Sequence, residues 1–370
     1  MTAPFATQTS QARAGEWFVL YGLSVLGALL LSALLVEATD GDWRPVVNAL
    51  LDGSVRGKGR WGETLGAAGP LLIVALGTVI SGRAGLVNIG QEGQLFVGAA
   101  FATYLGFVIG GPGPLNVVLI LFFGATGGAL WAGIAALLRY WRGVPEVLST
   151  LLLVTVGAQL VAYGLRYDWL LLAPEGDRGN RNQVSEQLAD DNRLPRPDLF
   201  GNEFPITVYI AISLAVVVSI VMARSVWGFR IRMLGRNPRV AQVSGVSGTH
   251  YGATALMLSG GFAGLAGACM LTGGAFAFGN YQLVPGFSAN IGWTGLLVAL
   301  VAREKALIAI PIAFVFAGLR TGSSFVGSTG VEGRVTDVIQ GLLVLALLVP
   351  PAVMFFRDRH RARVAAMGRV

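Results

Sequence analysis

Four side chains able to bind a polar solute lie within seven residues of one another: Asn88, Gln91, Glu92 and Gln94. They stand at the start of a short apolar stretch, residues 95–109. A carboxylate in the middle of a bilayer costs at least ~2–3 kcal/mol, so we expect Glu92 to face the interior of a helix bundle, a cavity or the headgroup region. These groups would either line a path for a polar solute or cap broken helix ends, and the sequence leaves both interpretations open.

The pattern around these residues recurs later in the chain. Residues 88–93 read NIGQEG and residues 290–295 read NIGWTG, and apolar residues follow both segments. Asn290 and Trp293 are therefore further candidates for a solute path. The indole of Trp293 would stack on a planar ligand, or it would serve as an interfacial or packing residue.

The elements that position these residues must be membrane helices. Of the 370 residues, 54% are hydrophobic and 13% are charged, whereas soluble domains have roughly 25% charged residues. This composition disfavours a soluble enzyme. Glycines spaced four apart, at Gly124 and Gly128 and at Gly260 and Gly264, predict close helix packing. Because a span needs ~20 apolar residues, we predict an all-α polytopic protein with about ten transmembrane helices: 17–36, 66–80, 95–109, 115–138, 144–165, 206–223, 251–271, 287–301, 306–319 and 335–353.

The loop charges predict the orientation of these spans. With both termini in the cytoplasm, the inner segments hold 16 of the 27 Lys and Arg residues, and the outer loop 166–203 has five Arg against eight Asp and Glu. This asymmetry is typical of an N-in, C-in protein. A second sequence echo, EVL at 146–148 and DVI at 337–339, follows the first in the same order. We therefore expect spans 2–5 and 7–10 to be inverted repeats.

We expect one transmembrane permease domain over residues 1–370. Its predicted parts are spans 1–5 at 17–165, an extracytoplasmic loop at 166–205, spans 6–10 at 206–353 with a cytoplasmic loop at 224–250, and a basic cytoplasmic tail at 354–370.

The cytoplasmic loop has the signals of a very short helix. Asn237 is a good N-cap, Pro238 suits the first helical position, and Gly245 suits the end. These signals predict a two-turn helix at about 238–244. An isolated helix this short is unstable in water, so it must dock on the membrane surface or on a partner protein.

Motifs for ATP binding and hydrolysis are missing from the sequence. It has no P-loop, no His-Glu-x-x-His and no Gly-x-Ser-x-Gly. Two His and one Cys are too few for a His-based metal site. We expect no enzymatic activity, no metal site and no cofactor on this chain, so a motor driven by ATP would belong to another polypeptide.

The decapeptide 85–94, GLVNIGQEGQ, resembles the GLxNIGxEGQ signature of permease subunits of bacterial ABC importers. Its nearest branch is that of the nucleoside and simple-sugar permeases, kin to the ribose and branched-chain amino acid permeases. Residues 145–150 and 338–342 resemble two further segments of that family, although this chain has Leu153 and Val154 where the family often has an Asn. The predicted short helix resembles the family's coupling-helix loop through Gly235, Asn237, Pro238, Ala241, Ser244 and Gly245.

The resemblance implies the rest of the system. Two permease subunits, often related but non-identical chains, form the path in the bacterial inner membrane. Cytoplasmic ATPase subunits, which hold ATP and Mg, dock on the coupling helices, and an extracytoplasmic binding protein delivers the ligand. The acidic outer loop would meet the binding protein or would simply be solvated. No nucleic acid partner is expected.

The sequence thus predicts a permease subunit of an ABC importer for nucleosides or related sugar-like solutes. The alternative within the family is a branched-chain amino acid permease, whose site would have to meet an ammonium and a carboxylate. An ion-coupled secondary transporter would need titratable groups at mid-membrane, for which Glu92 alone is thin support. A membrane-embedded enzyme is disfavoured by the missing catalytic set.

Overall fold

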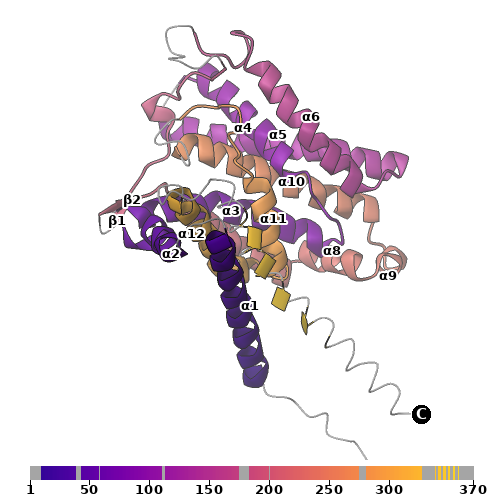
Figure 1. Ribbon diagram of the computed structural model, residues 1–370. Helices are drawn as coiled ribbons and strands as arrows, with labels where there is room; N and C mark the ends of the chain where they lie inside the picture. Colours follow the sequence, from indigo (N-terminus) through magenta and orange to yellow (C-terminus); the bar gives the residue numbers. More distant parts are fainter. Residues whose placement is uncertain are drawn as a thin grey trace, which may run out of the picture. The chain divides into compact units, whose positions relative to one another are not determined.

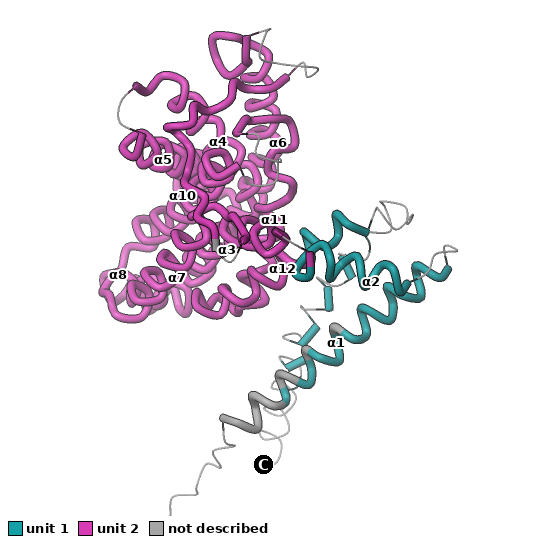
Figure 2. The backbone as a smooth tube through the Cα atoms, turned by 90° about the vertical axis from the view of Figure 1, so that its left-hand side faces the viewer, with its two compact units in different colours: residues 1–56, 319–370 teal, residues 57–318 magenta. Residues whose placement is uncertain are grey.

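The computed structural model describes residues 10–38, 43–57, 59–110, 113–174, 183–199, 201–274 and 281–326, with single helical positions between 338 and 357. Contacts divide the chain into two compact units, shown in teal and magenta in Figure 2: residues 1–56 with 319–370, and residues 57–318. The larger unit, 57–318, contains every candidate residue of the sequence analysis.

The smaller unit consists of helices that pack through small apolar residues. Its elements are α1 (Ser10–Ala38), α2 (Trp43–Leu51), a π-helical turn (Asp52–Arg56) and the end of α12 (Ala306–Val326). A Cβ on Gly322 of α12 would lie 2.5 Å from the carbonyl oxygen of Leu50 of α2, so these two backbones touch. The buried cluster consists of Ala28, Val36, Val46, Ala49, Val326 and Ala346.

The larger unit is a helix bundle (Figure 1). Its helices are α3 (Arg60–Arg83), α4 (Gln91–Val108), α5 (Gly113–Arg142), α6 (Glu146–Gly164), α7 (Thr207–Arg224), α8 (Val226–Arg236), α9 (Pro238–Val243), α10 (Gly248–Gly273), α11 (Ile291–Val301) and the start of α12. A 3-10 turn (Asp190–Asn192) and one antiparallel strand pair, β1 (Asp198–Leu199) with β2 (Asn202–Glu203), lie between α6 and α7.

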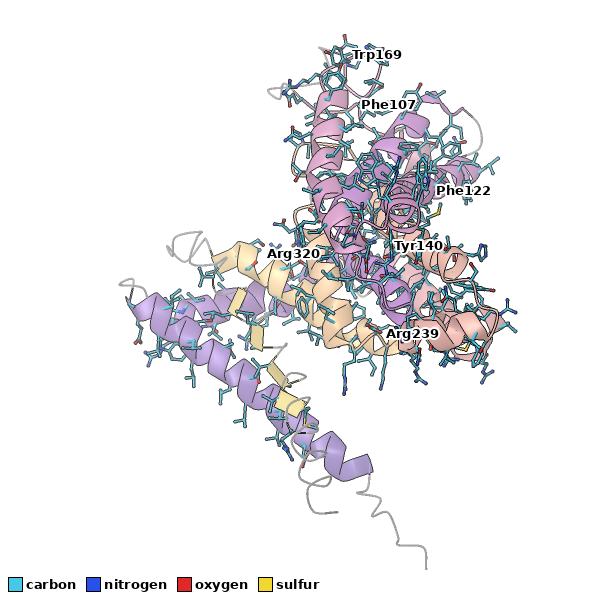
Figure 3. The ribbon with its side chains drawn as sticks, turned by 90° about the vertical axis from the view of Figure 1, so that its right-hand side faces the viewer. Phe107, Phe122, Tyr140, Trp169, Arg239 and Arg320 are labelled. Atoms are coloured by element: carbon cyan, nitrogen blue, oxygen red, sulfur yellow. The ribbon has the colours of Figure 1, made fainter. Side chains whose placement is uncertain are left out.

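Helices α3 and α10 form the centre of this bundle. In their most apolar stretches 89% of α3 and 72% of α10 is buried, against 33%, 28% and 33% for α5, α6 and α7. The outer helices expose large apolar side chains such as Phe122, which is 64% exposed and points away from the helices in Figure 3. Such a surface is what a helix presents to lipid tails.

Glycines bring α4, α5 and α10 into backbone contact. A Cβ on Gly264 would lie 2.2 Å from the carbonyl oxygen of Gly124, and one on Gly128 would lie 2.3 Å from that of Gly260. A Cβ on Gly98 of α4 would lie 2.3 Å from the Cα of Gly264. The predicted packing at the two glycine pairs is confirmed, because no larger residue fits these crossings.

Side-chain caps fix where the helices near the cytoplasmic loop begin. The Ser225 hydroxyl accepts from the N–H of Gly228 at the start of α8 (2.9 Å). The Ser247 hydroxyl accepts from the N–H of His250 at the start of α10 (3.2 Å). Each satisfies one of the free N–H groups of a first helical turn.

Four turns meet at one end of the larger unit. Arg83 donates to the carbonyl oxygen of Glu304 (2.9 Å), and a Cβ on Gly85 would lie 3.1 Å from the Cα of Gly235. The N–H of Val87 donates to a carboxylate oxygen of Glu146, the first residue of α6 (3.4 Å). These turns hold nine of the 16 Lys and Arg residues that the sequence assigns to the inner side. We call this end the basic end, and it comprises residues 83–90, 142–146, 224–247 and 302–305.

Residues 183–199 and 201–206 lie across the opposite end of the same unit. The side chain of Asn192 donates to the carbonyl oxygen of Gly106 near the end of α4 (3.1 Å). The N–H of Leu194 donates to the carbonyl oxygen of Thr272 near the end of α10 (2.8 Å). This segment therefore joins helices from both halves of the chain.

The structure supports a polytopic helical protein but does not confirm ten spans. Within the described residues, six helices are long and apolar enough to cross a bilayer: α3, α5, α6, α7, α10 and α12. The predicted spans 17–36 and 95–109 coincide with α1 and α4, which lie outside that set. Predicted span 287–301 is replaced by α11, whose 11 residues reach only about 16 Å, half of a ~30 Å bilayer core.

Three further predictions stay predictions. The tenth span, 335–353, falls largely outside the described residues. The N-in, C-in orientation and the single transmembrane domain over residues 1–370 are not tested by the contacts of the chain.

Candidate functional site

The site begins at the turn that ends α3. Gly85 has a φ of +74°, and its N–H donates to the carbonyl oxygen of Gly82 (2.8 Å). The N–H of Leu86 donates to the carbonyl oxygen of Ser81 (3.0 Å). This is the Schellman arrangement, in which a glycine takes the left-handed conformation just beyond a helix. It turns the chain so that residues 86–90 re-enter the bundle.

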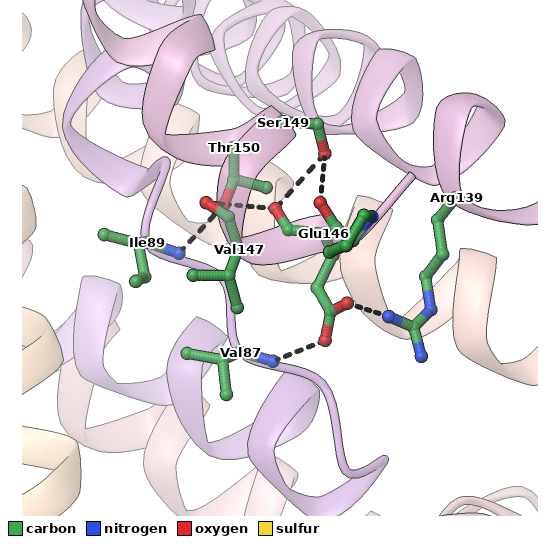
Figure 4. Close-up of polar contacts among 8 residues, drawn as sticks. Val87, Ile89, Arg139, Glu146, Val147, Ser149 and Thr150 are labelled. Carbon is green, nitrogen blue, oxygen red and sulfur yellow. Dashed lines mark hydrogen bonds and ion pairs between the residues drawn. The ribbon is translucent and has the colours of Figure 1, made fainter. Parts of the chain in front are cut away.

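The first turn of α6 holds this re-entering segment (Figure 4). A carboxylate oxygen of Glu146 accepts from the N–H of Val87 (3.4 Å), and the hydroxyl of Thr150 accepts from the N–H of Ile89 (3.3 Å). The same hydroxyl donates to the carbonyl oxygen of Glu146 (2.7 Å). Arg139 forms an ion pair with the Glu146 carboxylate. Two backbone N–H groups of an irregular segment are thereby satisfied inside the protein.

Asn88 lies between these two anchored residues and is fully buried. Its Nδ2 donates to Gln94 Oε1 (2.8 Å) and to Ser259 Oγ (2.9 Å). Its Oδ1 accepts from Gln94 Nε2 (3.0 Å) and from the N–H of Gly90 (3.0 Å). The side chain therefore makes all four hydrogen bonds that an amide can make.

Gln91 extends the same network to α3. Its Oε1 accepts from the hydroxyl of Thr78 (2.8 Å), and its Nε2 donates to the carbonyl oxygen of Val74 (3.2 Å) and to Ser259 Oγ (3.3 Å). We call Asn88, Gln91, Gln94, Thr78 and Ser259 the amide cluster. It ties α3, α4 and α10 together in the interior of the bundle.

Glu92 points away from the amide cluster and reaches the second half of the chain. One carboxylate oxygen accepts from the hydroxyl of Ser288 and from the N–H of Asn290 (3.2 Å). The other accepts from the N–H of Gly292 (2.7 Å). Glu92 thus caps the N-terminus of α11, where a carboxylate is favoured by free N–H groups and by the helix dipole.

The N-termini of α4 and α11 meet at this contact. A Cβ on Gly292 would lie 2.4 Å from the backbone nitrogen of Glu92, so only glycine allows the approach. From here α4 runs to the opposite end, where Gly106 is bound. Helix α11 runs to the basic end, where the following turn binds Arg83. The two related sequence segments therefore begin helices of opposite direction.

The six predicted path residues fall into two groups. Asn88, Gln91, Glu92 and Gln94 are buried and paired. Asn290 is exposed, with a φ of +67° and no side-chain bond to its own helix, and Trp293 is partly exposed. The contacts of Glu92 bring the two groups together.

Sequence reasoning missed the partners of these residues. Ser259, Thr78 and Ser288 each bind a predicted path residue, yet none was singled out. Serine and threonine occur throughout the predicted spans, so nothing in the local pattern distinguishes these three. Their importance depends on which segments are neighbours in space.

The predicted short helix at the basic end is confirmed as α9. Asn237 caps it by accepting from the N–H of Val240 (3.2 Å), and Pro238 takes the first position. Gly245 has a φ of +78°, and the N–H of Val246 donates to the carbonyl oxygen of Ala241 (2.9 Å), which completes a Schellman ending.

One side of α9 faces the protein and the other faces outward. Ala241 is buried with Leu234 and Val246. Val240 is 51% exposed and Val243 is 92% exposed. A short helix with an apolar outer face has surface available for a partner.

The loop that bears α9 lies directly against the turn that ends α3. A Cβ on Gly235 would lie 2.3 Å from the carbonyl oxygen of Arg83 and 2.8 Å from the backbone nitrogen of Gly85. On the other side of this turn, Arg83 Nε lies 3.9 Å from the Glu304 carboxylate. Partial burial raises the pKa of Glu304, and the charge of Arg83 opposes the shift.

Comparisons with known proteins identify the family of the chain. The sequence model of the family described as the permease component of branched-chain amino acid transport systems matches residues 62–348. The guanosine ABC transporter permease protein NupP of Bacillus subtilis is 29% identical over 313 residues, 82% of this chain and 85% of that protein.

Two further relatives cover nearly all of the chain. The glucose ABC transporter permease protein TsgB13 of Haloferax volcanii is 29% identical over 93% of this chain and 89% of that protein. The nucleoside ABC transporter permease protein NupB of Lactococcus lactis is 25% identical over 90% and 89%. With its apolar helices and the family match over most of its length, the chain belongs to the family of branched-chain amino acid transport system permeases and is a multi-pass membrane permease subunit of an ABC transporter.

Proposed function

We propose that this chain forms part of the path by which an ABC importer moves nucleosides or related sugar-like solutes across a bacterial inner membrane. Relatives named as guanosine, nucleoside and glucose permeases support this substrate class. The observation that carries the proposal is the meeting of α4 and α11, where an exposed amide and a partly exposed indole lie beside a buried polar network.

The length of α11 supports a position of this meeting point inside the bilayer. Helix α11 ends at the basic end, where the charged turn 302–305 follows it. The 11 residues of α11 span about 16 Å. Asn290 would therefore lie near mid-membrane, where a polar side chain facing lipid is costly. We propose that Asn290 faces the solute path, which a second permease subunit completes.

The chemistry of the two open residues suits a nucleoside. The amide of Asn290 offers hydrogen bonds to hydroxyls or base edges, and Trp293 offers a face for stacking on a planar base. Behind them Asn88, Gln91, Glu92 and Gln94 form the inner wall of the path. In the conformation described their polar atoms are hydrogen-bonded within the protein, so they shape the wall of the path through packing.

The proposed architecture is an inverted repeat with the basic end in the cytoplasm. The opposite directions of α4 and α11 from related sequence segments support the repeat. The gathering of basic turns at one end supports an N-in, C-in orientation.

The remaining subunits are proposed from the family and from the two ends of the chain. Cytoplasmic ATPase subunits holding ATP and Mg²⁺ would dock on α9, through Gly235, Asn237, Pro238, Ala241, Ser244 and Gly245. An extracytoplasmic binding protein would meet the opposite end. The second permease would be a related chain.

Reconstitution in liposomes tests this proposal. The chain is combined with its ATPase, its second permease and its binding protein, and uptake of labelled nucleosides is measured. We expect uptake to require ATP and the binding protein, and unlabelled nucleosides to compete while leucine does not. Competition by leucine alone would favour the branched-chain amino acid alternative. Uptake driven by a proton or sodium gradient without ATP would contradict the ABC mechanism.

Docking on α9 is tested by substitution of its most exposed side chain. Val243→Asp should weaken co-purification of the ATPase by about tenfold, because a desolvated charge in an apolar contact costs ~1–3 kcal/mol. The melting temperature should stay unchanged, since Val243 is 92% exposed. Gln242→Asp, at the neighbouring exposed position, is the matched control. Replacement of residues 237–245 by a Gly-Ser linker should abolish association yet leave insertion intact, and unchanged association would refute the assignment.

A further inference from the structure

Among the residues that the structure describes, the side chain of Glu92 supplies the hydrogen bonds that join the start of α4 to the start of α11. Glu92 is 5% exposed, and its carboxylate accepts from three donors, namely the hydroxyl of Ser288 and the N–H groups of Asn290 and Gly292. These donors come from a segment about 200 positions away in the chain. Both oxygens of the Glu92 carboxylate are therefore occupied by hydrogen bonds from the segment that begins α11.

Resting on the proposed function, we propose that Glu92 is a positioning residue. Its carboxylate holds the start of α11 in place, and so sets where Asn290 and Trp293 stand relative to the amide cluster. Asn290 is itself one of the capped residues, and Trp293 follows Gly292 directly. A displaced helix start would therefore move both side chains that we place on the solute path.

The chemistry of the contact requires a carboxylate. Two oxygens that only accept face one hydroxyl and two backbone N–H groups, and the N–H groups can only donate. In Glu92→Gln the amide keeps one oxygen, and its NH₂ group must then face either the N–H of Gly292 or the donors of Ser288 and Asn290. One side of the cap is lost although the side chain keeps its size. Glu92→Asp keeps the charge but shortens the reach by one methylene.

The rest of α4 is held independently of Glu92. The amide cluster fixes α4 to α3 and α10 through Asn88, Gln91 and Ser259. Loss of the Glu92 cap should therefore loosen the α4–α11 contact and leave the α4–α10 contact intact. This difference separates a positioning role from a general contribution to stability.

Spin-label distances in the full-length chain in lipid nanodiscs measure this difference directly. The only cysteine, Cys269, is replaced by Ala, and labels are placed at two exposed positions, Tyr104→Cys on α4 and Ala289→Cys beside the cap. The reference pair joins Tyr104→Cys to Leu258→Cys on α10, next to Ser259. Both pairs are measured with Glu92 intact and with Glu92→Gln.

We expect Glu92→Gln to broaden or shift the distance between α4 and the cap, while the α4–α10 distance keeps its width. Glu63→Gln is the matched control, because Glu63 is an exposed carboxylate of the same unit that pairs with Arg60 at the surface. It should change neither distance. If both distances broaden together in Glu92→Gln, the residue only stabilises the fold, and if neither changes, it does not hold α11. Either result overturns the proposal.

Uptake kinetics connect the position of α11 to transport. In the reconstituted complex Glu92→Gln should raise the KM for the solute about tenfold, since a buried bond to a charged group is lost, with ATPase association unchanged. Glu63→Gln should transport normally. If no variant, the control included, shows ATP-dependent uptake, the proposed function fails, and the distance measurement still decides the role of Glu92.

Discussion

At the residue scale, the two asparagines of the site differ in what surrounds their amides. Asn88 is fully buried and satisfies four hydrogen bonds inside the bundle. Asn290 is exposed and its side chain leaves the capping of α11 to Glu92. A buried network is needed for the fold, whereas an open amide is available to a solute.

Removal of each amide should separate these two roles. Asn88→Ala leaves Gln94 without its partner and takes one hydrogen bond from Ser259, so we expect the free energy of unfolding to fall by about 1–3 kcal/mol, measured by thermal melting in detergent. Asn290→Gly, which accepts the left-handed φ of +67° without strain, should leave the melting temperature unchanged and lower nucleoside uptake. An equal loss of stability in both variants would mean that Asn290 is also a structural residue.

Glu304 gives the basic end a pH dependence. Burial raises its pKa above the usual value, so the folded protein binds the proton more tightly than the unfolded chain does. Its contribution is then most favourable below the usual pKa and is lost as the pH rises through the raised pKa. Glu304→Gln should therefore gain melting temperature over the parent as the pH rises from about 4 to about 8. A difference that is constant with pH would exclude this ionisation as the cause.

At the element scale, the short helix α9 connects to the interior through glycines. The last turn of α8, which leads directly into α9, touches the Schellman turn of α3 at Gly235 and Gly85. The same turn leads directly to Val87 and Ile89, which α6 holds, and so to Asn88 between them. A displacement of α9 therefore has a short, backbone-to-backbone connection to the amide cluster.

A methyl group at this contact should disturb it. In Gly235→Ala the new Cβ would lie 2.3 Å from the carbonyl oxygen of Arg83, so backbone must shift. We expect a loss of about 1–3 kcal/mol of stability and less uptake per ATP hydrolysed. Gly248→Ala is the control, because its Cβ would meet only the side chain of Leu234 at 3.5 Å. Equal behaviour of the two variants would exclude the close contact as a coupling element.

At the scale of the whole molecule, the larger unit has two chemically different ends. Basic turns gather at one end, and residues 183–199 and 201–206 lie across the other and join α4 to α10. A permease with an ATPase on one side and a solute arriving from the other needs such a distinction. The two related helices α4 and α11 start from one interior point and run to different ends.

Cysteine labelling in cells should establish which end is cytoplasmic. In a Cys269→Ala background, Asp190→Cys at the opposite end should react with an impermeant maleimide in intact cells. Val243→Cys on α9 should react only after lysis. Both side chains are highly exposed, so accessibility depends on the side of the membrane. The reverse pattern would refute the N-in, C-in orientation.

Much of the helical content was predictable, whereas the count of ten spans stays a prediction. Eight of the nine predicted spans from 17–36 to 306–319 coincide with helices, because long apolar stretches have few alternatives in lipid. The stretch 287–301 is the exception: its first residues form turns, with a φ of +46° at Ala289 and +67° at Asn290, and the helix starts only at Ile291, where Glu92 supplies a cap. The helices α2 and α8 were missed because their polar faces dilute the apolar signal.

Features that depend on neighbouring residues were predictable from the sequence: membrane helices from long apolar runs, glycine contacts from four-residue spacing, and α9 from Asn237, Pro238 and Gly245. Which polar groups are buried and which are open depends on the folded structure. The partner of Glu92 lies about 200 positions away, and Ser259 gains its role only by meeting α4. Local propensity acts over a few residues, whereas the hydrogen-bond partners of a membrane interior come from whichever segments the fold brings together.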